Sequence, residues 1–542
     1  MNSPQLRAAV QAWIADETDP NAAAGLQDLM DAGAWEELAN RFAAPLTFGT
    51  AGLRGPLRAG PNGMNQTVVR RAAAGLAAWL TSTGAAGPVV IGYDGRVRSY
   101  DFAHDSAAIF AAAGFEAKIM PRELPTPVLA FAVRHLGAVA GVMVTASHNP
   151  PRDNGYKVYL ADGGQIAPPV DVEIEAAIRA VASVRAVPLA ETYEVLEDEV
   201  VEAYVAAVAA LAGPGPREVR IVHTALHGVG TEVVRKVFAA AGFAEPVSVA
   251  AQAEPDGDFP TVAFPNPEEP GALDLAFATA GEVAADLIIA NDPDADRCAV
   301  AVPDQTAPAG GRSPADAGVA GGGWRMLRGD EVGVLLADAL LAKGVRGTYA
   351  TTIVSSSMLG AIAADHGVGY AETLTGFKWI SRAAPDLVFG YEEALGYAVA
   401  PDLVRDKDGV SAALLVAELA AALKADGRTL LDRLADLWAR YGRYATDQLS
   451  VRVTDLADIG AMMARLRSAP PVTLLGRPVA YEDLLPATDG VRLRGDGLRV
   501  VVRPSGTEPK LKAYLELVLD ADSDPSDDLA RLKEQIAAAL DD

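Results

Sequence analysis

The chain repeats one order of apolar and polar segments in three places. An apolar run rich in β-branched residues leads into a short polar loop and then an Ala/Leu-rich helical stretch, starting within residues 88–96, 219–230 and 347–359. Strands that alternate with helices at this spacing predict α/β layers with buried, partly parallel sheets. Because ligands bind near the carboxyl ends of such strands, the polar loops are candidate functional sites.

The two ends of the chain follow other patterns. Residues 1–45 carry Leu6, Val10, Trp13 and Ile14 at helical spacing, which predicts amphipathic helices that form an added N-terminal collar. From residue 441 apolar and polar residues alternate, and a final helical stretch, "DDLARLKEQIAAALDD", follows. This pattern predicts a smaller α+β domain at the C-terminus.

The length of the chain predicts several domains. Since single hydrophobic cores stop growing near ~250–300 residues, a chain of 542 residues should form about three to five domains. The segment 303–327 is rich in Gly, Ala and Pro, and we interpret it as a surface loop that carries no chemistry. The expected domains comprise residues 1–205, which include the collar, 206–325, 326–440 and 441–542.

The charge balance argues against several kinds of partner. With 46 Lys and Arg against 71 Asp and Glu, the net charge is −25, a field that repels nucleic acid and anionic membrane surfaces. A single cysteine, Cys298, cannot form an intramolecular disulfide, and the acidic first residues do not resemble a signal peptide. No apolar run reaches the ~18 residues that would suggest a membrane span. We expect a soluble, cytoplasmic monomer or small homo-oligomer that binds neither nucleic acid nor membranes.

The stretch "ADLIIANDPDADRCAV" places three carboxylates directly after an apolar strand. Asp292, Asp294 and Asp296 are spaced by two residues, so an extended loop could turn them towards a common point. Carboxylate ligands suit a hard cation such as Mg²⁺. An EF-hand is excluded, because Arg297 and Pro303 stand where its Gly and its last acidic residue are required. The alternative interpretation is a solvated acidic turn.

Two other stretches contain groups that could bind a ligand, one an anion and the other vicinal hydroxyls. In "RPSGTEPKLKAY", Arg503, Ser505, Gly506 and Thr507 could form an anion-binding nest of hydroxyl and N–H groups, although a simple hairpin turn is the alternative. In "GYEEALGY", Glu392 and Glu393 could accept hydrogen bonds from vicinal sugar hydroxyls, and a helix start is the competing interpretation. Lys378 and Lys407 lie in nearby polar loops, where a solvated lysine is the ordinary finding.

The stretch "VMVTASHNPPRDNGYKVY" contains one serine, Ser147, in a polar loop, where its hydroxyl is expected to be presented to a ligand. Ser147 lacks the Gly-x-Ser-x-Gly elbow of α/β-hydrolases, because Thr145 and Asn149 occupy the flanking positions. His148 is adjacent in sequence rather than placed like the base of a triad, so acyl-transfer chemistry is disfavoured. The remaining alternatives are a turn before Pro150 and a serine that carries a group.

Taken together and in this order, the stretches resemble the α-D-phosphohexomutase superfamily of phosphoglucomutases and phosphomannomutases. The resemblance covers nearly the whole chain and rests on "TFGTAGLRGPL", "GYDGR", "TASHNP", "DPDADR", "TGFK", "GYEEALGY" and "RPSGTEPK". The collar, "AGLRGPLRAGPNGMN", "HTALHGVG" and "EEALGY" with "RDKDGVSA" are most similar to the branch of phosphopentomutases, glucose-1,6-bisphosphate synthases and bacterial phosphosugar mutases.

The resemblance implies a fold and a reaction. The fold is α/β, with three related α/β domains that contain mixed sheets and a smaller C-terminal α+β domain, arranged as a heart around a central cleft. The reaction, that of a phosphoglucomutase or phosphomannomutase, moves a phosphoryl group between the C1 and C6 (or C5) hydroxyls of an aldose phosphate, through a phosphoserine enzyme and a sugar bisphosphate. A phosphopentomutase or a sugar-1,6-bisphosphate synthase is the alternative. Mg²⁺ and an activating sugar 1,6-bisphosphate are the implied cofactors.

The resemblance also assigns roles to residues. Ser147 is the phosphorylated residue and, with Asp292, Asp294 and Asp296, it holds the metal. The nest of Arg503, Ser505, Gly506 and Thr507 binds the non-reacting phosphate, and Glu392 contacts sugar hydroxyls. His148, Lys157, Arg54 and Lys407 are further catalytic candidates, with Lys157 or Lys407 as the acid/base, and Arg297, Lys378 and Glu393 are further substrate-binding candidates.

One position departs from the family pattern. Many hexose-specific members have Ser two residues after the first Glu of the sugar loop, where this chain has Ala394. A missing hydrogen bond to a substrate hydroxyl can change discrimination substantially, which leaves pentose phosphates possible. A metal-dependent sugar phosphatase and an inactive binding protein remain as competing hypotheses. The phosphate nest disfavours the first, and the filled Ser, Asp and Arg positions disfavour the second.

Overall fold

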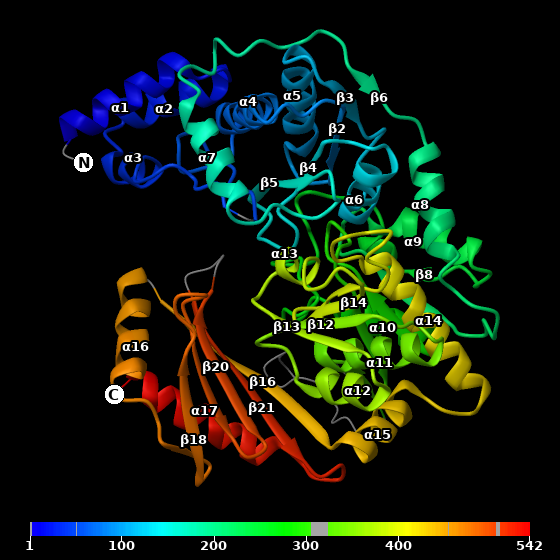
Figure 1. Cartoon of the computed structure of the whole chain (residues 1–542). Helices are drawn as coiled ribbons and strands as arrows, with labels where there is room; N and C mark the ends of the chain where they lie inside the picture. The colour runs from blue at the N-terminus through cyan, green and yellow to red at the C-terminus, as the bar shows by residue number, and fades with distance from the viewer. Residues whose placement is uncertain (1–2, 50, 305–322, 454, 506–509, 542) are drawn as a thin grey trace. The chain divides into compact units, whose positions relative to one another are not determined.

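The computed structural model describes residues 3–49, 51–304, 323–453, 455–505 and 510–541. Within these ranges the chain forms two compact units. Unit 1 comprises residues 1–303 and 396–422, and unit 2 comprises residues 304–395 and 423–542. Figure 1 shows the helices and strands of both units, many of them labelled, and each unit is described by itself.

Unit 1 begins with the N-terminal helices α1 (Ser3–Asp16), α2 (Pro20–Asp31) and α3 (Trp35–Arg41). The Asp19 side chain caps α2 by accepting a hydrogen bond from the backbone N–H of Asn21, and Pro20 occupies the first turn. Leu6, Val10 and residues of α2 and α3 form a small core of their own. The amphipathic pattern therefore arises because each helix buries one face within this collar.

The first sheet of unit 1 has the strand order β1-β5-β4-β2-β3-β6. The strands β2, β3, β4 and β6 are parallel, whereas β5 runs antiparallel to β4 and β1, so the sheet is mixed. Val89 and Ile91 of β2 join one core with α4 and α5, and the intervening Val90 points to the opposite face, as strand alternation requires. The elements are β1 (Leu53–Pro56), α4 (Gln66–Ser82), β2 (Pro88–Tyr93), α5 (Ser99–Ala112), β3 (Glu116–Ile119), α6 (Thr126–His135), β4 (Ala140–Val144), β5 (Asp153–Leu160), α7 (Val170–Ala180) and β6 (Glu194–Val195).

The second sheet of unit 1 contains strands in the order β10-β9-β7-β8. The strands β7, β8 and β9 are parallel, and β10 is antiparallel to β9. Leu287 to Ala290 of β9 are all buried. Because both faces of this strand are covered, all of its residues are apolar. The elements are α8 (Glu199–Ala209), β7 (Ile221–Thr224), α9 (Gly230–Ala240), β8 (Val247–Ser248), the 3₁₀ helix Ala250–Gln252, α10 (Asp274–Val283), β9 (Leu287–Ala290) and β10 (Ala299–Pro303), followed later in the chain by β15 (Gly396–Ala398) and the start of α14 (Gly409–Ala425).

Unit 2 contains a parallel sheet and a larger antiparallel sheet. The parallel strands lie in the order β13-β12-β14, and the antiparallel sheet has the order β16-β21-β20-β19-β18-β17. Side chains of α16 and α17 share one core with the antiparallel strands. The elements are β11 (Trp324–Met326), α11 (Gly329–Ala342), β12 (Thr348–Thr352), α12 (Met358–His366), β13 (Gly369–Thr373), α13 (Phe377–Ile380), β14 (Leu387–Glu392), α15 (Leu430–Tyr441), β16 (Arg443–Arg452), α16 (Leu456–Ser468), β17 (Thr473–Leu474), β18 (Arg477–Asp483), β19 (Val491–Gly495), β20 (Leu498–Pro504), β21 (Lys510–Leu519) and α17 (Ser526–Asp541).

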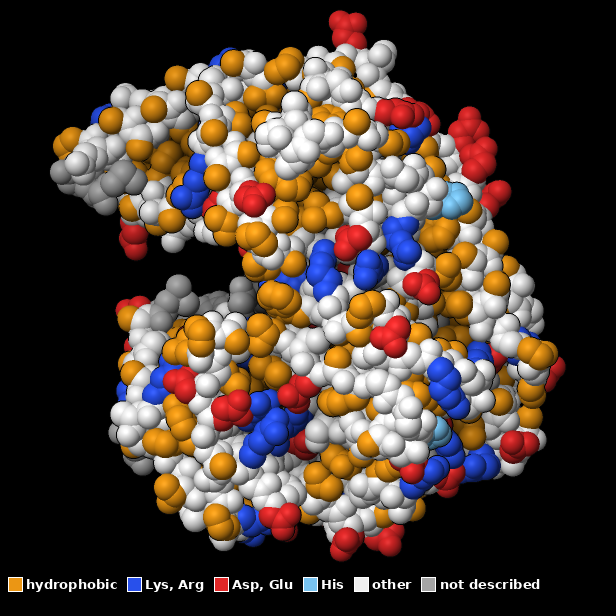
Figure 2. Space-filling view, in the orientation of Figure 1, with side chains coloured by type: hydrophobic (Ala, Val, Ile, Leu, Met, Phe, Trp, Pro, Cys, Tyr) orange, Lys and Arg blue, Asp and Glu red, His pale blue; other side chains and the backbone are white. Residues whose placement is uncertain are grey.

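This architecture confirms the predicted succession of mixed α/β sheets and a C-terminal α+β domain. The three repeated segments form β2, β7 and β12, each followed by a loop and a helix. Residues 305–322, most of the predicted surface loop, lie outside the described residues. Acidic and basic side chains are interspersed with apolar ones over the face shown in Figure 2. None of the helices in the described ranges combines the length and apolar composition needed to cross a bilayer.

Candidate active site

Ser147 lies in the loop that joins two buried strands of the first sheet, β4 and β5. Its backbone is in the left-handed region with φ of 52°, and its N–H donates to Thr145 Oγ1 at 2.8 Å. The side-chain Oγ donates to Asp292 Oδ2 at 2.6 Å and lies 3.2 Å from His148 Nδ1. A non-glycine residue is held at positive φ only where its surroundings fix it, which is a common feature of functional sites.

The three carboxylates predicted to act together do converge. Asp292, Asp294 and Asp296 follow β9, are fully buried, and offer oxygen atoms that all lie within 4.8 Å of one another. The loop is packed tightly: a Cβ on Gly228 would lie 2.3 Å from Pro293 Cα. An approach this close allows only glycine in the "HTALHGVG" segment, so part of that pattern has a packing cause.

Two lysines neutralise the buried carboxylates. Lys157 Nζ, from β5, lies 2.6 Å from Asp294 Oδ2 and 2.8 Å from Asp296 Oδ2. Lys407 Nζ, from the loop before α14, lies 3.1 Å from the same Asp296 oxygen. Segments far apart in the sequence therefore supply both charges, as is needed when buried ions must be paired.

The pKa values of the cluster reflect its crowding. Burial and the negative charges of Asp294 and Asp296 raise the pKa of Asp292 well above its usual range. Burial opposes the charged form of Asp296 as well, but Lys157 and Lys407 outweigh it and lower the pKa of this carboxyl. The two lysines therefore do not compensate the negative charge next to Asp292. A bound cation would stabilise the ionised form of this carboxyl.

The donor set fits a hard divalent metal. Three carboxylates provide the oxygen ligands that Mg²⁺ prefers. Among the described residues, Asp294 Oδ1 and Asp296 Oδ1 are buried without a hydrogen-bond partner, although buried polar atoms are normally paired. Asp292, Asp294, Asp296 and Ser147 Oγ are therefore suited to hold such an ion together.

Further basic groups surround Ser147. Arg54 is on β1, and its Nη1 donates to Asn149 Oδ1 at 3.4 Å. Just before this strand, Gly52 has φ of 73°, and a Cβ there would lie only 1.8 Å from Tyr156 O. Burial, together with the charges of Arg297 and Arg54, lowers the pKa of His148 well below its usual range. His148 is thus neutral near pH 7 and can accept or donate one hydrogen bond.

The predicted sugar and phosphate loops lie in unit 2. Glu393 Oε2 accepts from Ser355 Oγ at 2.9 Å, which fixes the residue after β14. Burial and the charge of Glu393 raise the pKa of Tyr514 above its usual range, Arg503 opposes them, and Glu392 adds to the increase. Residues of the predicted sugar loop and of the predicted phosphate loop thus both affect the pKa of Tyr514. Lys378 is on α13, with its Nζ 5.8 Å from the Trp379 ring centre.

The phosphate nest is described only in part. Ser505 N, directly after β20, donates to the carbonyl of Lys510, the first residue of β21, at 2.8 Å. Gly506 and Thr507, predicted to complete the nest, lie outside the described residues.

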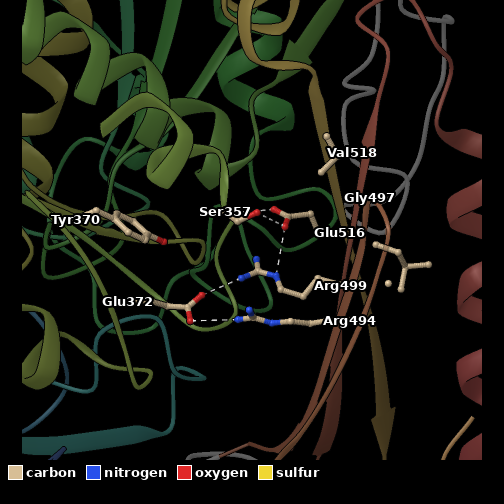
Figure 3. Close-up of a pocket in the computed structure, with 10 residues that line it drawn as sticks. Ser357, Tyr370, Glu372, Arg494, Gly497, Arg499, Glu516 and Val518 are labelled. Carbon is tan, nitrogen blue, oxygen red and sulfur yellow. Dashed lines mark hydrogen bonds and ion pairs between the residues drawn. The ribbon is translucent and has the colours of Figure 1, made fainter. Parts of the chain in front are cut away.

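Unit 2 also contains a cavity of about 430 Å³ between β13 and the antiparallel sheet, shown in Figure 3. Arg499 reaches both Glu372 and Glu516, at 3.2 and 3.3 Å, and Arg494 reaches Glu372 at 3.7 Å. Glu516 accepts from the N–H and Oγ of Ser357, the residue that precedes α12. These charges neutralise one another, so the group ties the two sheets of the unit together.

Sequence reasoning missed several residues that support the centre. Thr126 Oγ1 donates to Asp294 Oδ2 at 2.5 Å, and Asp406 accepts from Tyr159 Oη at 2.8 Å and from the N–H of Lys407 at 2.8 Å. Arg96 donates to backbone carbonyls of the Ser147 loop. Arg96 and Asp406 lie in motifs that the sequence does show, "GYDGR" and "RDKDGVSA", but neither motif indicated a role for them.

Similarity to known proteins identifies the family. Models described as phosphoglucomutase/phosphomannomutase α/β/α domains I, II and III and C-terminal domain match residues 45–185, 202–305, 328–441 and 449–539. A Haemophilus influenzae protein named "Probable phosphomannomutase" is 48% identical over 84% of this chain and 93% of its own length. The chain belongs to the phosphoglucomutase/phosphomannomutase family.

Two further relatives of this mutase cover almost its whole length. The phosphopentomutase of Mus musculus is 32% identical over 98% of this chain and 93% of its own. A crystal structure from Thermus thermophilus, of a protein assigned as a phosphomannomutase, superposes with a TM-score of 0.72 at 27% identity, covering 92% of this chain and 99% of that one. The chain is accordingly a phosphosugar mutase, an isomerase that acts as a phosphotransferase on small sugar phosphates.

Proposed function

We propose that this mutase moves the phosphoryl group between C1 and C6 (or C5) of an aldose phosphate through a phosphoserine at Ser147 and a sugar bisphosphate. The observation that carries this proposal is the 2.6 Å hydrogen bond from Ser147 Oγ to Asp292 Oδ2, inside a buried cluster of carboxylates and lysines. An unmodified serine hydroxyl is a weak nucleophile, but a phosphoserine can donate its phosphoryl group and later receive another.

The transfer involves two changes of bonding. A sugar hydroxyl oxygen forms a bond to the phosphorus on Ser147 while the bond from phosphorus to Ser147 Oγ breaks. The proton leaves the sugar hydroxyl, and Ser147 Oγ regains one. Lys157 and Lys407, which meet at one oxygen of Asp296, are our candidates for moving these protons. The bisphosphate then reorients, and its other phosphoryl group returns to Ser147 by the reverse steps.

We assign Mg²⁺ to Asp292, Asp294, Asp296 and the phosphorylated Ser147, where it would neutralise charge on the phosphoryl oxygens during transfer. A sugar 1,6-bisphosphate is the proposed activator, because a molecule that escapes before its second transfer leaves Ser147 without a phosphoryl group. Arg54 and Arg297 are the proposed electrostatic partners of the moving phosphoryl, and His148 is proposed to orient the Ser147 side chain.

Substrate binding is assigned to unit 2. We propose that Glu392 and Glu393 accept hydrogen bonds from the sugar hydroxyls and that Lys378 lies beside them. The non-reacting phosphate is assigned to Arg503, Ser505, Gly506 and Thr507. The charge of Arg503 near Tyr514, and the effect of both glutamates on the same tyrosine, support this grouping.

A hexose phosphate, glucose or mannose phosphate, is the proposed substrate, in keeping with the 48% identical relative named as a phosphomannomutase. A pentose phosphate is the second candidate, favoured by Ala394 in the sugar loop and by the relative named as a phosphopentomutase. The test is to incubate the enzyme with glucose-1-, mannose-1- or ribose-1-phosphate, Mg²⁺ and trace sugar bisphosphate. The isomer formed fastest identifies the sugar, and inorganic phosphate without isomer would refute the mutase mechanism in favour of a phosphatase.

A further inference from the structure

Arg96 is buried against the Ser147 loop, and the steps of the reaction described above do not involve this residue. It follows β2 in "GYDGR", while the Ser147 loop follows β4, and the two strands are parallel neighbours with Tyr93 paired to Val144. Loops after adjacent parallel strands emerge at the same edge of a sheet, which explains how these two segments meet.

The guanidinium of Arg96 binds the loop through its backbone. Nη2 donates to Ser147 O and Asn149 O, both at 2.6 Å, and Nη1 donates to Pro150 O at 2.9 Å and Asp153 O at 3.0 Å. Three of these acceptors lie in the loop between β4 and β5, and the fourth, Asp153, is the first residue of β5. Only a planar, forked cation can serve four carbonyls that converge from one side; an ammonium offers a single nitrogen.

The guanidinium is itself held in place. Its Nε lies 3.6 Å from Asp94 Oδ2, and its central carbon lies 4.9 Å from the ring centre of Phe259. Asp94 Oδ1 in turn accepts from Ser99 Oγ at 2.7 Å and from the N–H of Arg96 at 3.0 Å. With 3% of its surface exposed, Arg96 cannot move away without breaking the loop's bonds.

We propose that Arg96 is a positioning residue that sets the loop so that Ser147 presents its Oγ, or its phosphoryl group, to the carboxylate centre. This proposal rests on the proposed function of Ser147. The positive φ of Ser147 supports it, because a strained backbone persists only where several contacts fix it, and the carbonyl of this residue is one of the four acceptors. Arg96 does not touch the reacting atoms; it acts through the position of Ser147.

The test compares Arg96→Lys and Arg96→Ala with wild type. A displacement of about 1 Å at a reacting atom costs about 10²-fold in rate, so we expect kcat to fall by about that factor in Arg96→Lys while KM changes little. Adding guanidinium ion to Arg96→Ala should restore part of kcat, a response that loss of folding would not give. Arg98→Lys is the matched control and should keep wild-type kcat, because Arg98 pairs with Asp19 and Asp101 away from this loop.

The rate of phosphoryl transfer from glucose 1,6-bisphosphate to Ser147, followed by intact mass, separates the two proposals. If wild type gains no phosphoryl group on Ser147, the proposed function fails. If wild type is phosphorylated and Arg96→Lys is phosphorylated and turns over equally fast, only the positioning role is overturned. Should Arg96→Ala be too unstable to assay, Arg96→Lys alone decides, with thermal unfolding as the check that it is folded.

Discussion

Asp330, in the first turn of α11, should make the stability of unit 2 depend on pH. Its Oδ1 accepts from the N–H of Ser356 at 2.6 Å and from Tyr391 Oη at 3.2 Å, so it joins the loop after β12 to strand β14. Burial raises the pKa of Asp330 from an ordinary 3.8 to about 7, and the nearby charges of Glu393 and Glu516 add to this effect. The folded protein thus binds a proton here that the unfolded chain has already lost.

The sign and size of the effect follow from this difference. Between pH 4 and 7 the folded state holds more protons at Asp330 than the unfolded state, so the free energy of unfolding falls as pH rises through this range. At about 1.4 kcal/mol per pKa unit, the loss amounts to about 4 kcal/mol and is complete above pH 7. Asp330→Asn keeps an acceptor oxygen for Ser356 but cannot ionise, so it should avoid the loss.

Urea unfolding of wild type and Asp330→Asn between pH 4 and 8 measures the difference. The two should be similar at low pH, and the variant should become the more stable by up to about 4 kcal/mol at pH 8. Asp338→Asn controls for loss of a carboxylate from the same helix, since Asp338 is paired with Arg433 at 2.7 Å. A stability difference between Asp330→Asn and wild type that stays constant across the pH range would refute this reasoning.

Three substitutions in unit 1, one of them a control, test the metal site and the close approach at Gly52. Asp294→Asn removes one carboxylate of the proposed metal site and should lower kcat by at least about 10²-fold while raising the Mg²⁺ concentration needed for activity; an unaffected rate would reject the metal assignment. Gly52→Ala should destabilise the protein by more than about 2 kcal/mol in thermal or urea unfolding, because the added Cβ would lie 1.8 Å from Tyr156 O. Gly84→Ala, at the same φ of 73° but with nothing within 4 Å, should cost only about 1 kcal/mol, and equal costs would show that the close approach is unimportant.

Much of the site could be predicted because its groups follow strands. Ser147 and the three aspartates lie in polar loops directly after β4 and β9, where the apolar run ends and the carboxyl edge of a parallel sheet begins. The local pattern of apolar and polar residues therefore predicts that position. The motifs then indicated the chemistry, and the order of the strands explains why the loops could be expected to hold a ligand.

The rest depends on contacts that the local pattern does not record. That Lys157 and Lys407 share one oxygen of Asp296 follows only from the folding of three distant segments together. The motif "GYDGR" gave no role to Arg96, because the partners of this side chain are backbone carbonyls, which every residue has. Asp406 likewise contacts the backbone, because its carboxylate accepts from the N–H of the next residue, Lys407. Asp406 is fully buried, where a charged side chain is rare unless it is paired.

The central claim is that Ser147 carries the phosphoryl group. Wild type and Ser147→Ala should be incubated with glucose 1,6-bisphosphate and Mg²⁺, and their intact masses and peptide masses compared alongside their turnover. We expect one phosphoryl group on the wild-type peptide that contains Ser147, none on the variant, and mutase activity of the variant reduced to background. A phosphoryl group on another residue, or full turnover by Ser147→Ala, would contradict it.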